Sequence, residues 1–145
     1  MGEGQSLQDP EIGTEKGVLI FLVVVGGALG GVVRHLLIRY MERVSSKGFP
    51  WGTLVVNALG AFILGAFFGS ANTLPGSASA FHEGKAFLAV GFCGGLTTFS
   101  TFSLQVLALL SAGKRGLASA NIIGSVVVCL ASAAGGFAMV RAVIG

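Results

Sequence analysis

Residues 91–103 read Gly-Phe-Cys-Gly-Gly-Leu-Thr-Thr-Phe-Ser-Thr-Phe-Ser, a stretch rich in glycine and hydroxyl groups inside an otherwise apolar segment. Lipid hydrocarbon cannot satisfy loose backbone groups, so polar or irregular backbone at membrane depth occurs only where it is buried in protein or lines a wet path. The stretch has no carboxylate, histidine or lysine, which leaves no candidate for acid–base catalysis or proton relay. It offers hydroxyls, carbonyls and aromatic ring edges, and we therefore expect a site here.

The composition places the chain among membrane proteins. Of its 145 residues, 53% are hydrophobic and 10% are charged, and most of the 24 glycines lie inside apolar runs, where they suit close helix packing. The formal net charge of +3 arises from lysines and arginines beside those runs, at the depth of lipid headgroups. No basic cluster indicates nucleic acid and no nucleotide motif is present, so the lipid bilayer is the expected partner.

Four segments are long and apolar enough to cross a hydrocarbon core about 30 Å thick, which takes about 20 residues per helix. They are residues 18–38, 52–71, 86–110 and 117–140. We therefore expect an all-α membrane domain over residues 18–145, with a break in the third helix at Gly94 and Gly95. Four short helices seldom enclose a pore, so the sequence favours a homo-oligomer.

The charged residues lie at the ends of these spans and outside them. Residues 1–17 hold four acids and one lysine, which predicts a solvated, disordered acidic tail. The positive-inside rule favours a cytoplasmic position for the loops after the first and third spans. Their basic residues are Arg39, Arg43, Lys47, Lys114 and Arg115.

The polar groups within the spans are neutral. All six acids lie outside the spans, at Glu3, Asp9, Glu11, Glu15, Glu42 and Glu83. Intramembrane acids usually mark cation binding and proton coupling, so this pattern argues against cation-selective pores and proton-driven antiporters. The polar groups that remain are rich in N–H and O–H donors, which suits an anion that must give up its water. They are Asn57, Thr97, Thr98, Ser100, Thr101, Ser103, Gln105, Asn121 and Ser125.

Several residues have both a structural and a functional interpretation. Asn57 either makes an interhelical hydrogen bond or lines a pore. Phe99 and Phe102 share one helical face, and either pack in the core or turn the positive edges of their rings towards an anion. Arg34, near the end of the first span, either extends to the headgroups or attracts anions in a vestibule. The residue types alone leave these alternatives open.

Three motifs resemble those of the Fluc (CrcB-type) fluoride channels. They are Gly-Gly-x-x-Gly-x-x-x-Arg at residues 26–34, Gly-Thr-x-x-Val-Asn-x-x-Gly at residues 52–60, and Gly-x-x-Thr-Thr-Phe-Ser-Thr-Phe at residues 94–102. The resemblance covers nearly everything after the tail, and the third motif is highly specific. It implies a passive channel, not an enzyme, that lets cytoplasmic fluoride leave through the inner membrane of the cell. It also implies an antiparallel, dual-topology homodimer with two pathways.

The resemblance assigns roles to single residues as well. The fluoride pathway would run along Asn57, Phe99, Ser100, Thr101, Phe102 and Ser125. The main-chain carbonyls of Gly94 and Thr97 would hold one structural sodium ion between the subunits. Arg34 matches the family's arginine in the first span, and we assign it to the vestibule. The chain departs from the family pattern at Asn121 and Cys129, where relatives often carry a tyrosine and a hydroxyl.

Two other functions fit the size of the chain. A small four-helix multidrug transporter normally needs a membrane glutamate to exchange protons for drugs, and the four spans have none. A non-transporting subunit of a larger membrane complex would show apolar packing with few convergent polar groups, unlike residues 97–103. The sequence therefore favours the fluoride channel.

Overall fold

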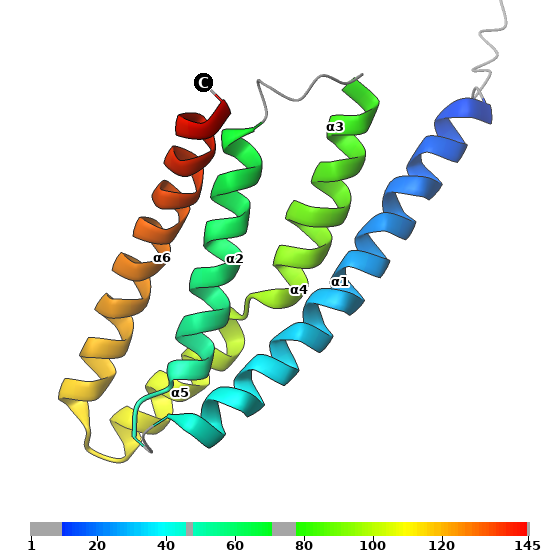
Figure 1. Ribbon diagram of the computed structural model, residues 1–145. Coiled ribbons are helices and arrows are strands. Elements are labelled where there is room, and N and C mark those ends of the chain that lie inside the picture. Colours follow the sequence, from blue (N-terminus) through cyan, green and yellow to red (C-terminus); the bar gives the residue numbers. More distant parts are fainter. Residues whose placement is uncertain (1–9, 46–47, 71–77, 145) are drawn as a thin grey trace, which may run out of the picture.

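The computed structural model describes residues 10–45, 48–70 and 78–144, and every regular element among them is a helix (Figure 1). Four stretches are long and apolar enough to cross a membrane, namely Gly13–Val44, Trp51–Gly69, Phe81–Ser111 and Arg115–Ile144. The predicted architecture of four spans is confirmed. Successive spans run in opposite directions, so the connections after the first and third spans lie at the same end of the molecule.

Helix α1, Pro10–Val44, is longer than the bilayer core. Its 35 residues extend about 52 Å at 1.5 Å per residue, against about 30 Å of hydrocarbon. Pro10 suits the first position of a helix, because an N–H is not needed there and the fixed φ is already helical. The helix therefore includes residues 10–17, which we expected in the tail, while residues 1–9 lie outside the described part of the chain.

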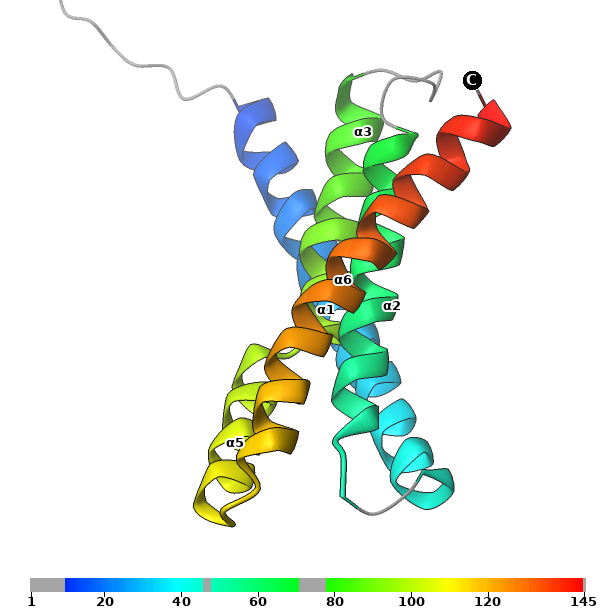
Figure 2. The same cartoon turned by 90° about the vertical axis from the view of Figure 1, so that its left-hand side faces the viewer.

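Helices α2, Trp51–Gly69, and α6, Arg115–Ile144, lie side by side in both views of the molecule (Figure 1, Figure 2). Glycines bring their backbones together: a Cβ on Gly65 would collide with the Ala133 carbonyl, and one on Gly136 with the Phe62 carbonyl. Such close approach provides packing energy where lipid removes the hydrophobic driving force between helices. These small residues therefore act in packing, as expected.

The first half of the third span packs against α1. Helix α3, Ala78–Gly84, leads into η1, Lys85–Cys93, which has the wider π-helical turn, and then into the single turn α4, Gly94–Leu96. A Cβ on Gly30 of α1 would collide with the Phe92 carbonyl, and one on Gly95 with the Gly27 carbonyl. The two backbones are therefore in direct contact along this half.

The third span breaks at Thr97 and Thr98, just after the glycines at which we expected the break. Thr97 has φ −81° and ψ 156°, and Thr98 has φ −148° and ψ 117°, so both are extended. The expected position was wrong because Gly94 and Gly95 remain helical, and Gly95 serves the contact with α1. Two consecutive β-branched threonines favour the extended backbone that interrupts the helix.

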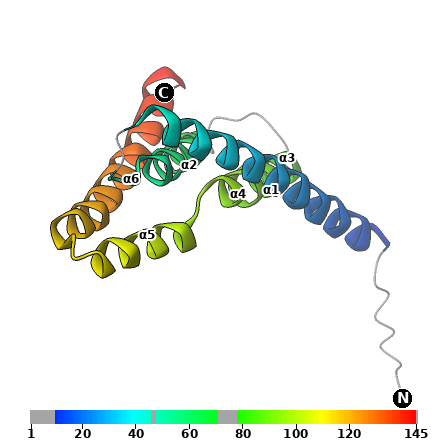
Figure 3. The ribbon, with the colours of Figure 1, turned by 90° about the horizontal axis from the view of Figure 1, so that it is seen from below.

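Helix α5, Phe99–Ser111, diverges from α1 and α2 after the break, as the view from below shows (Figure 3). In the part of the chain that the structure describes, no α5 residue is buried. The most deeply buried apolar side chains are Val56 of α2 and Leu96 of α4, which are fully buried, and Ala118 of α6, which is nearly so. The second half of the third span is therefore open to its surroundings.

Candidate functional site

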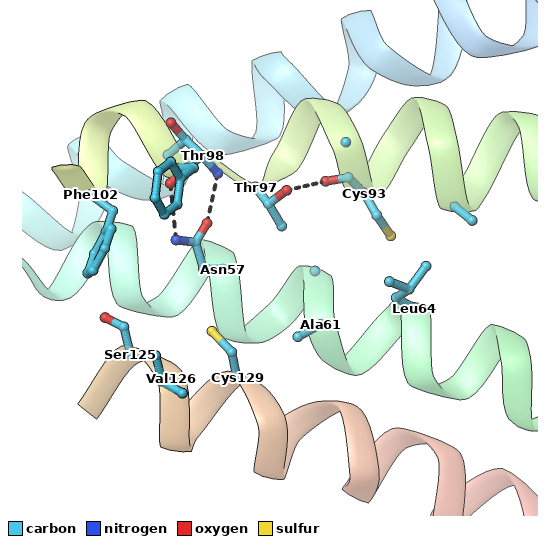
Figure 4. Close-up of a pocket in the computed structure, with 14 residues that line it drawn as sticks. Asn57, Ala61, Leu64, Cys93, Thr97, Thr98, Phe102, Ser125, Val126 and Cys129 are labelled. Atoms are coloured by element: carbon cyan, nitrogen blue, oxygen red, sulfur yellow. Dashed lines mark hydrogen bonds between the residues drawn. The ribbon is translucent and has the colours of Figure 1, made fainter. Parts of the chain in front are cut away.

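Side chains from two other helices bind the main chain of the break, and Figure 4 shows the one from α2. The Asn57 carboxamide, on α2, accepts a hydrogen bond from the Thr98 N–H at 2.8 Å and donates one to the Thr98 carbonyl at 3.2 Å. Arg34, on α1, donates from Nη1 to the Thr97 carbonyl at 3.1 Å, and the Thr97 N–H donates to the Cys93 carbonyl at 2.9 Å. All four main-chain polar groups of the break thus have partners, as a membrane interior requires.

Three hydroxyl groups gather at the first turn of α5. The Thr98 Oγ1 accepts a hydrogen bond from the Thr101 N–H at 3.2 Å, which caps the helix. The same hydroxyl donates to Thr101 Oγ1 at 3.0 Å and lies 3.3 Å from Ser100 Oγ. Free N–H groups and the helix dipole make such an N-terminus favourable for negative charge.

One face of the break opens into a groove of about 510 Å³, which we call the phenylalanine groove. Its lining includes Asn57, Thr98, Phe99, Phe102 and Ser125 (Figure 4). The two rings lie 5.8 Å apart at an angle of 42°, and the Phe99 side chain is 80% exposed. The core-packing alternative therefore does not hold for Phe99 within one chain.

A second face of the break opens into a groove of about 650 Å³, which we call the arginine groove. Its lining includes Arg34, His35, Thr98, Ser100 and Thr101. Arg34 is half-buried and bound to the Thr97 carbonyl, so its guanidinium does not extend to the headgroups. The expected pathway residues therefore fall into two groups: Asn57, Phe99, Phe102 and Ser125 line the phenylalanine groove, whereas Ser100 and Thr101 line the arginine groove.

Two further polar side chains lie one helical turn before Asn57 and Ser125. Thr53 and Asn121 are 2% and 1% exposed, and neither Thr53 Oγ1 nor Asn121 Nδ2 has a hydrogen-bond partner among the described residues. Ser125 Oγ donates to Asn121 Oδ1 at 3.3 Å. Buried polar atoms are nearly always paired with protein or water, so these two atoms are candidates for contact with a bound water or ion. Thr53 was not among the expected site residues, although its spacing of four from Asn57 places both on one helical face.

Arg34 supplies the positive charge at the break. It lines the arginine groove, and in the described chain no carboxylate lines either groove. Clusters of three or more His, Cys, Asp or Glu side chains that would hold a metal ion are also absent from the described residues. The oxygen ligands on offer at the break are thus carbonyls and hydroxyls.

The match to known sequences covers both grooves. The model of the family described as CrcB-like protein, Camphor Resistance (CrcB), matches residues 21–137. The chain belongs to this family. It is 45% identical over 112 residues to the fluoride-specific ion channel FluC of Opitutus terrae, with 77% of this chain and 84% of that relative covered. It is 42% identical over 123 residues to the FluC of Hahella chejuensis, with 84% and 94% covered, and 40% identical over 131 residues to that of Nitrobacter winogradskyi, with 88% and 99% covered.

Proposed function

We propose that this multi-pass membrane protein is a passive, fluoride-selective channel that lets cytoplasmic fluoride leave down its electrochemical gradient. The observation that carries the proposal is the pair of grooves at the helix break, which offer hydroxyls, an amide, ring edges and an arginine, with no carboxylate among the described residues that line them. The relatives named as fluoride-specific ion channels support the choice of ion. An inside-negative potential favours anion exit by about 2.3 kcal/mol per charge per 100 mV, so transport needs no enzymatic or proton-coupled step.

The chemistry of the grooves suits a small, strongly hydrated anion. A pathway for fluoride must replace its water with closely spaced donors that do not hold the ion too tightly. Ser100 and Thr101 supply hydroxyls beside the N-terminus of α5, and Phe99 and Phe102 supply ring edges in the phenylalanine groove. Arg34 attracts anions, while its bond to the Thr97 carbonyl keeps the guanidinium part of the wall.

A second copy of the chain completes each pathway in this proposal. Phe99, Ser100 and Ser103 are exposed on α5. The Ser103 hydroxyl donates to the Phe99 carbonyl and the Ser100 hydroxyl lies 3.3 Å from Thr98 Oγ1, but the remaining hydrogen-bonding positions of both hydroxyls would find no partners in lipid. A copy that covers this side gives the hydroxyls a polar enclosure and gives the Phe99 ring a neighbour. The resemblance to the Fluc channels supplies the antiparallel orientation, the two pathways and the inner membrane of the cell.

The proposal includes one structural sodium ion between the two copies. The Gly94 carbonyl suits such an ion, because Gly94 lines the phenylalanine groove and the Thr98 N–H, which a continuous helix would direct to that carbonyl, is bound to Asn57 instead. The Thr97 carbonyl already accepts a hydrogen bond from Arg34, and its second lone pair stays available. When bound, the ion would supply a positive charge that draws together the carbonyls of two breaks.

Fluoride flux from liposomes tests the function directly. Purified protein is placed in vesicles loaded with potassium fluoride, valinomycin is added, and external fluoride is followed with an electrode. We expect rapid fluoride efflux, and little chloride efflux from matched vesicles loaded with potassium chloride. Comparable chloride efflux would contradict selectivity. A requirement for a pH gradient would favour the multidrug transporter, and a lack of flux would favour the non-transporting subunit.

A further inference from the structure

We infer that Asn57 and Arg34 act as positioning residues that hold the break of the third span extended. They do so by replacing main-chain partners that a continuous helix would supply, and we call the pair the clamp. The inference rests on the proposed function, since it assigns these two residues an effect on the ion that is exerted through Thr97 and Thr98. It also implies that the extended shape of the break does not depend on the sodium ion.

The Asn57 arm of the clamp imitates a peptide. Its carboxamide pairs with both the N–H and the carbonyl of Thr98, at 2.8 Å and 3.2 Å. Two residues that face each other in an antiparallel β-ladder exchange hydrogen bonds in the same way. The pairing occupies the acceptor and one of the two donors of the side chain. Asn57 therefore fixes the orientation of the Thr98 peptide, and with it the start of α5.

The Arg34 arm holds the preceding carbonyl from the opposite helix. Gly30 brings the backbone of α1 onto the Phe92 carbonyl, and Arg34 follows four residues later on the same helical face. From there its guanidinium reaches the Thr97 carbonyl at 3.1 Å. The glycine thus sets the distance between the two helices at which the arginine can bind the break.

A second glycine places the Asn57 arm in the same way. Gly60 lies three residues after Asn57, and a Cβ there would collide with the Thr97 Cγ2. The motifs at residues 26–34 and 52–60 therefore work in the same way. In each, a glycine allows close contact with the third span, and a polar side chain on the same helical face binds the main chain of the break.

The clamp makes a metal ion unnecessary for the extended shape of the break. The Thr97 N–H is bound to the Cys93 carbonyl, so each of the four main-chain polar groups of Thr97 and Thr98 has a partner within one chain. A sodium ion on the Gly94 and Thr97 carbonyls would then join two copies without shaping either of them.

Amide hydrogen exchange, resolved by NMR in ¹⁵N-threonine-labelled protein, tests the Asn57 arm. Asn57→Leu keeps the size of the side chain and removes both bonds, so we expect the Thr98 amide to exchange about tenfold faster. Asn57→Asp keeps the acceptor and is expected to restore Thr98 protection relative to Asn57→Leu. Ser125→Ala, in the same groove but not bonded to the break, is the control and leaves Thr98 protection unchanged. The Thr97 amide, which donates to the Cys93 carbonyl and not to Asn57, reports general unfolding of the third span.

Equal protection of Thr98 in the parent and in Asn57→Leu would overturn the inference. A loss of protection at both Thr97 and Thr98 would overturn it too, because Asn57 would then stabilise the fold in general. Arg34→Met, which removes the donor and keeps the length, provides an independent check: the ¹³C shift of the Thr97 carbonyl moves while that of Thr98 stays.

Replacement of sodium by N-methylglucamine separates the clamp from the ion. We expect the Thr98 amide to remain protected after exhaustive exchange, whatever happens to the association of two copies. Collapse of this protection on sodium removal would assign the shape of the break to the ion and overturn the inference. The exchange measurements need no flux, so a failed clamp and a failed fluoride channel give different results.

Discussion

The two halves of the third span lie in opposite environments. Before the break, Cys93 and Leu96 are buried, and Gly91 and Gly95 bring the backbone onto α1. After the break, no residue of α5 is buried within the described chain, and its hydroxyls and the Phe99 ring line open grooves. The half with small residues finds its partner inside the chain. The half with donor groups is left free, and that is the half to which we assign the ion.

The break itself links these two environments. An uninterrupted helix would have its N-terminal N–H groups at the membrane surface, whereas α5 begins at Phe99, part-way along the third span. Broken helices of transport proteins place helix N-termini at depth, where their dipoles favour negative charge. The change of environment and the attraction for an anion therefore have one origin, the extended backbone at Thr97 and Thr98.

The half of the third span before the break, which packs against α1, is more sensitive than α5 to small changes in side-chain volume. Gly30→Ala puts a methyl group into the Phe92 carbonyl and 2.8 Å from the Leu96 N, and neither backbone atom can yield. We expect a loss of about 3 kcal/mol or more of unfolding free energy and little folded protein. Gly31→Ala is the matched control, because a Cβ there meets nothing within 4 Å. Thermal unfolding followed by size-exclusion chromatography measures both, and equal stability of the two variants would refute the packing argument.

Asn57, which binds the Thr98 peptide between the two halves of the third span, is expected to have the next largest effect. Asn57→Asp cannot donate to the Thr98 carbonyl, and it places a negative charge where an anion must pass. A charge at membrane depth costs about 3 kcal/mol, so we expect fluoride flux to fall roughly a hundredfold. The liposome assay measures this loss. Parental flux in the variant would show that neither the charge nor the hydrogen bond at this position affects conduction.

Substitutions in α5, the half of the third span after the break, are expected to leave the fold intact and to lower fluoride flux. Phe99→Ile and Phe102→Ile keep an apolar side chain but remove the ring edge, and the Phe99 ring has little packing within its own chain to lose. An aromatic edge contributes about 1 kcal/mol, so flux should fall by roughly fivefold to tenfold with folding and association intact. Liposome flux beside chromatography separates the two effects. Unchanged flux in both variants would leave the rings with a packing role alone.

The sequence predicted the four spans and the presence of a break, because span length and intramembrane polarity are local properties of the chain. It did not place the break correctly, because the low helix propensity of Gly94 and Gly95 is overridden by the contact that Gly95 makes with α1. The sequence also did not predict the clamp formed by Asn57 and Arg34. Asn57 and Thr98 are 41 residues apart and Arg34 and Thr97 are 63 apart, so no spacing along the chain reveals that they meet.

The smallest effect on stability and flux is expected for a substitution of Thr53. It tests whether the polar environment around α5 continues into the core. Its hydroxyl is buried and has no partner among the described residues. A truly unpaired hydroxyl costs about 1–3 kcal/mol, so Thr53→Val would then stabilise the protein and leave flux unchanged. A hydroxyl that binds water or the passing ion gives the opposite result, with stability near that of the parent and flux lowered by a few-fold.

We expect the second outcome, because Asn121 Nδ2 is also buried without a partner among the described residues and lies at the equivalent position, four residues before Ser125. Unfolding midpoint and fluoride flux, measured on the same preparation, distinguish the two, and a stabilised variant with parental flux would confine the polar region to the grooves at the break.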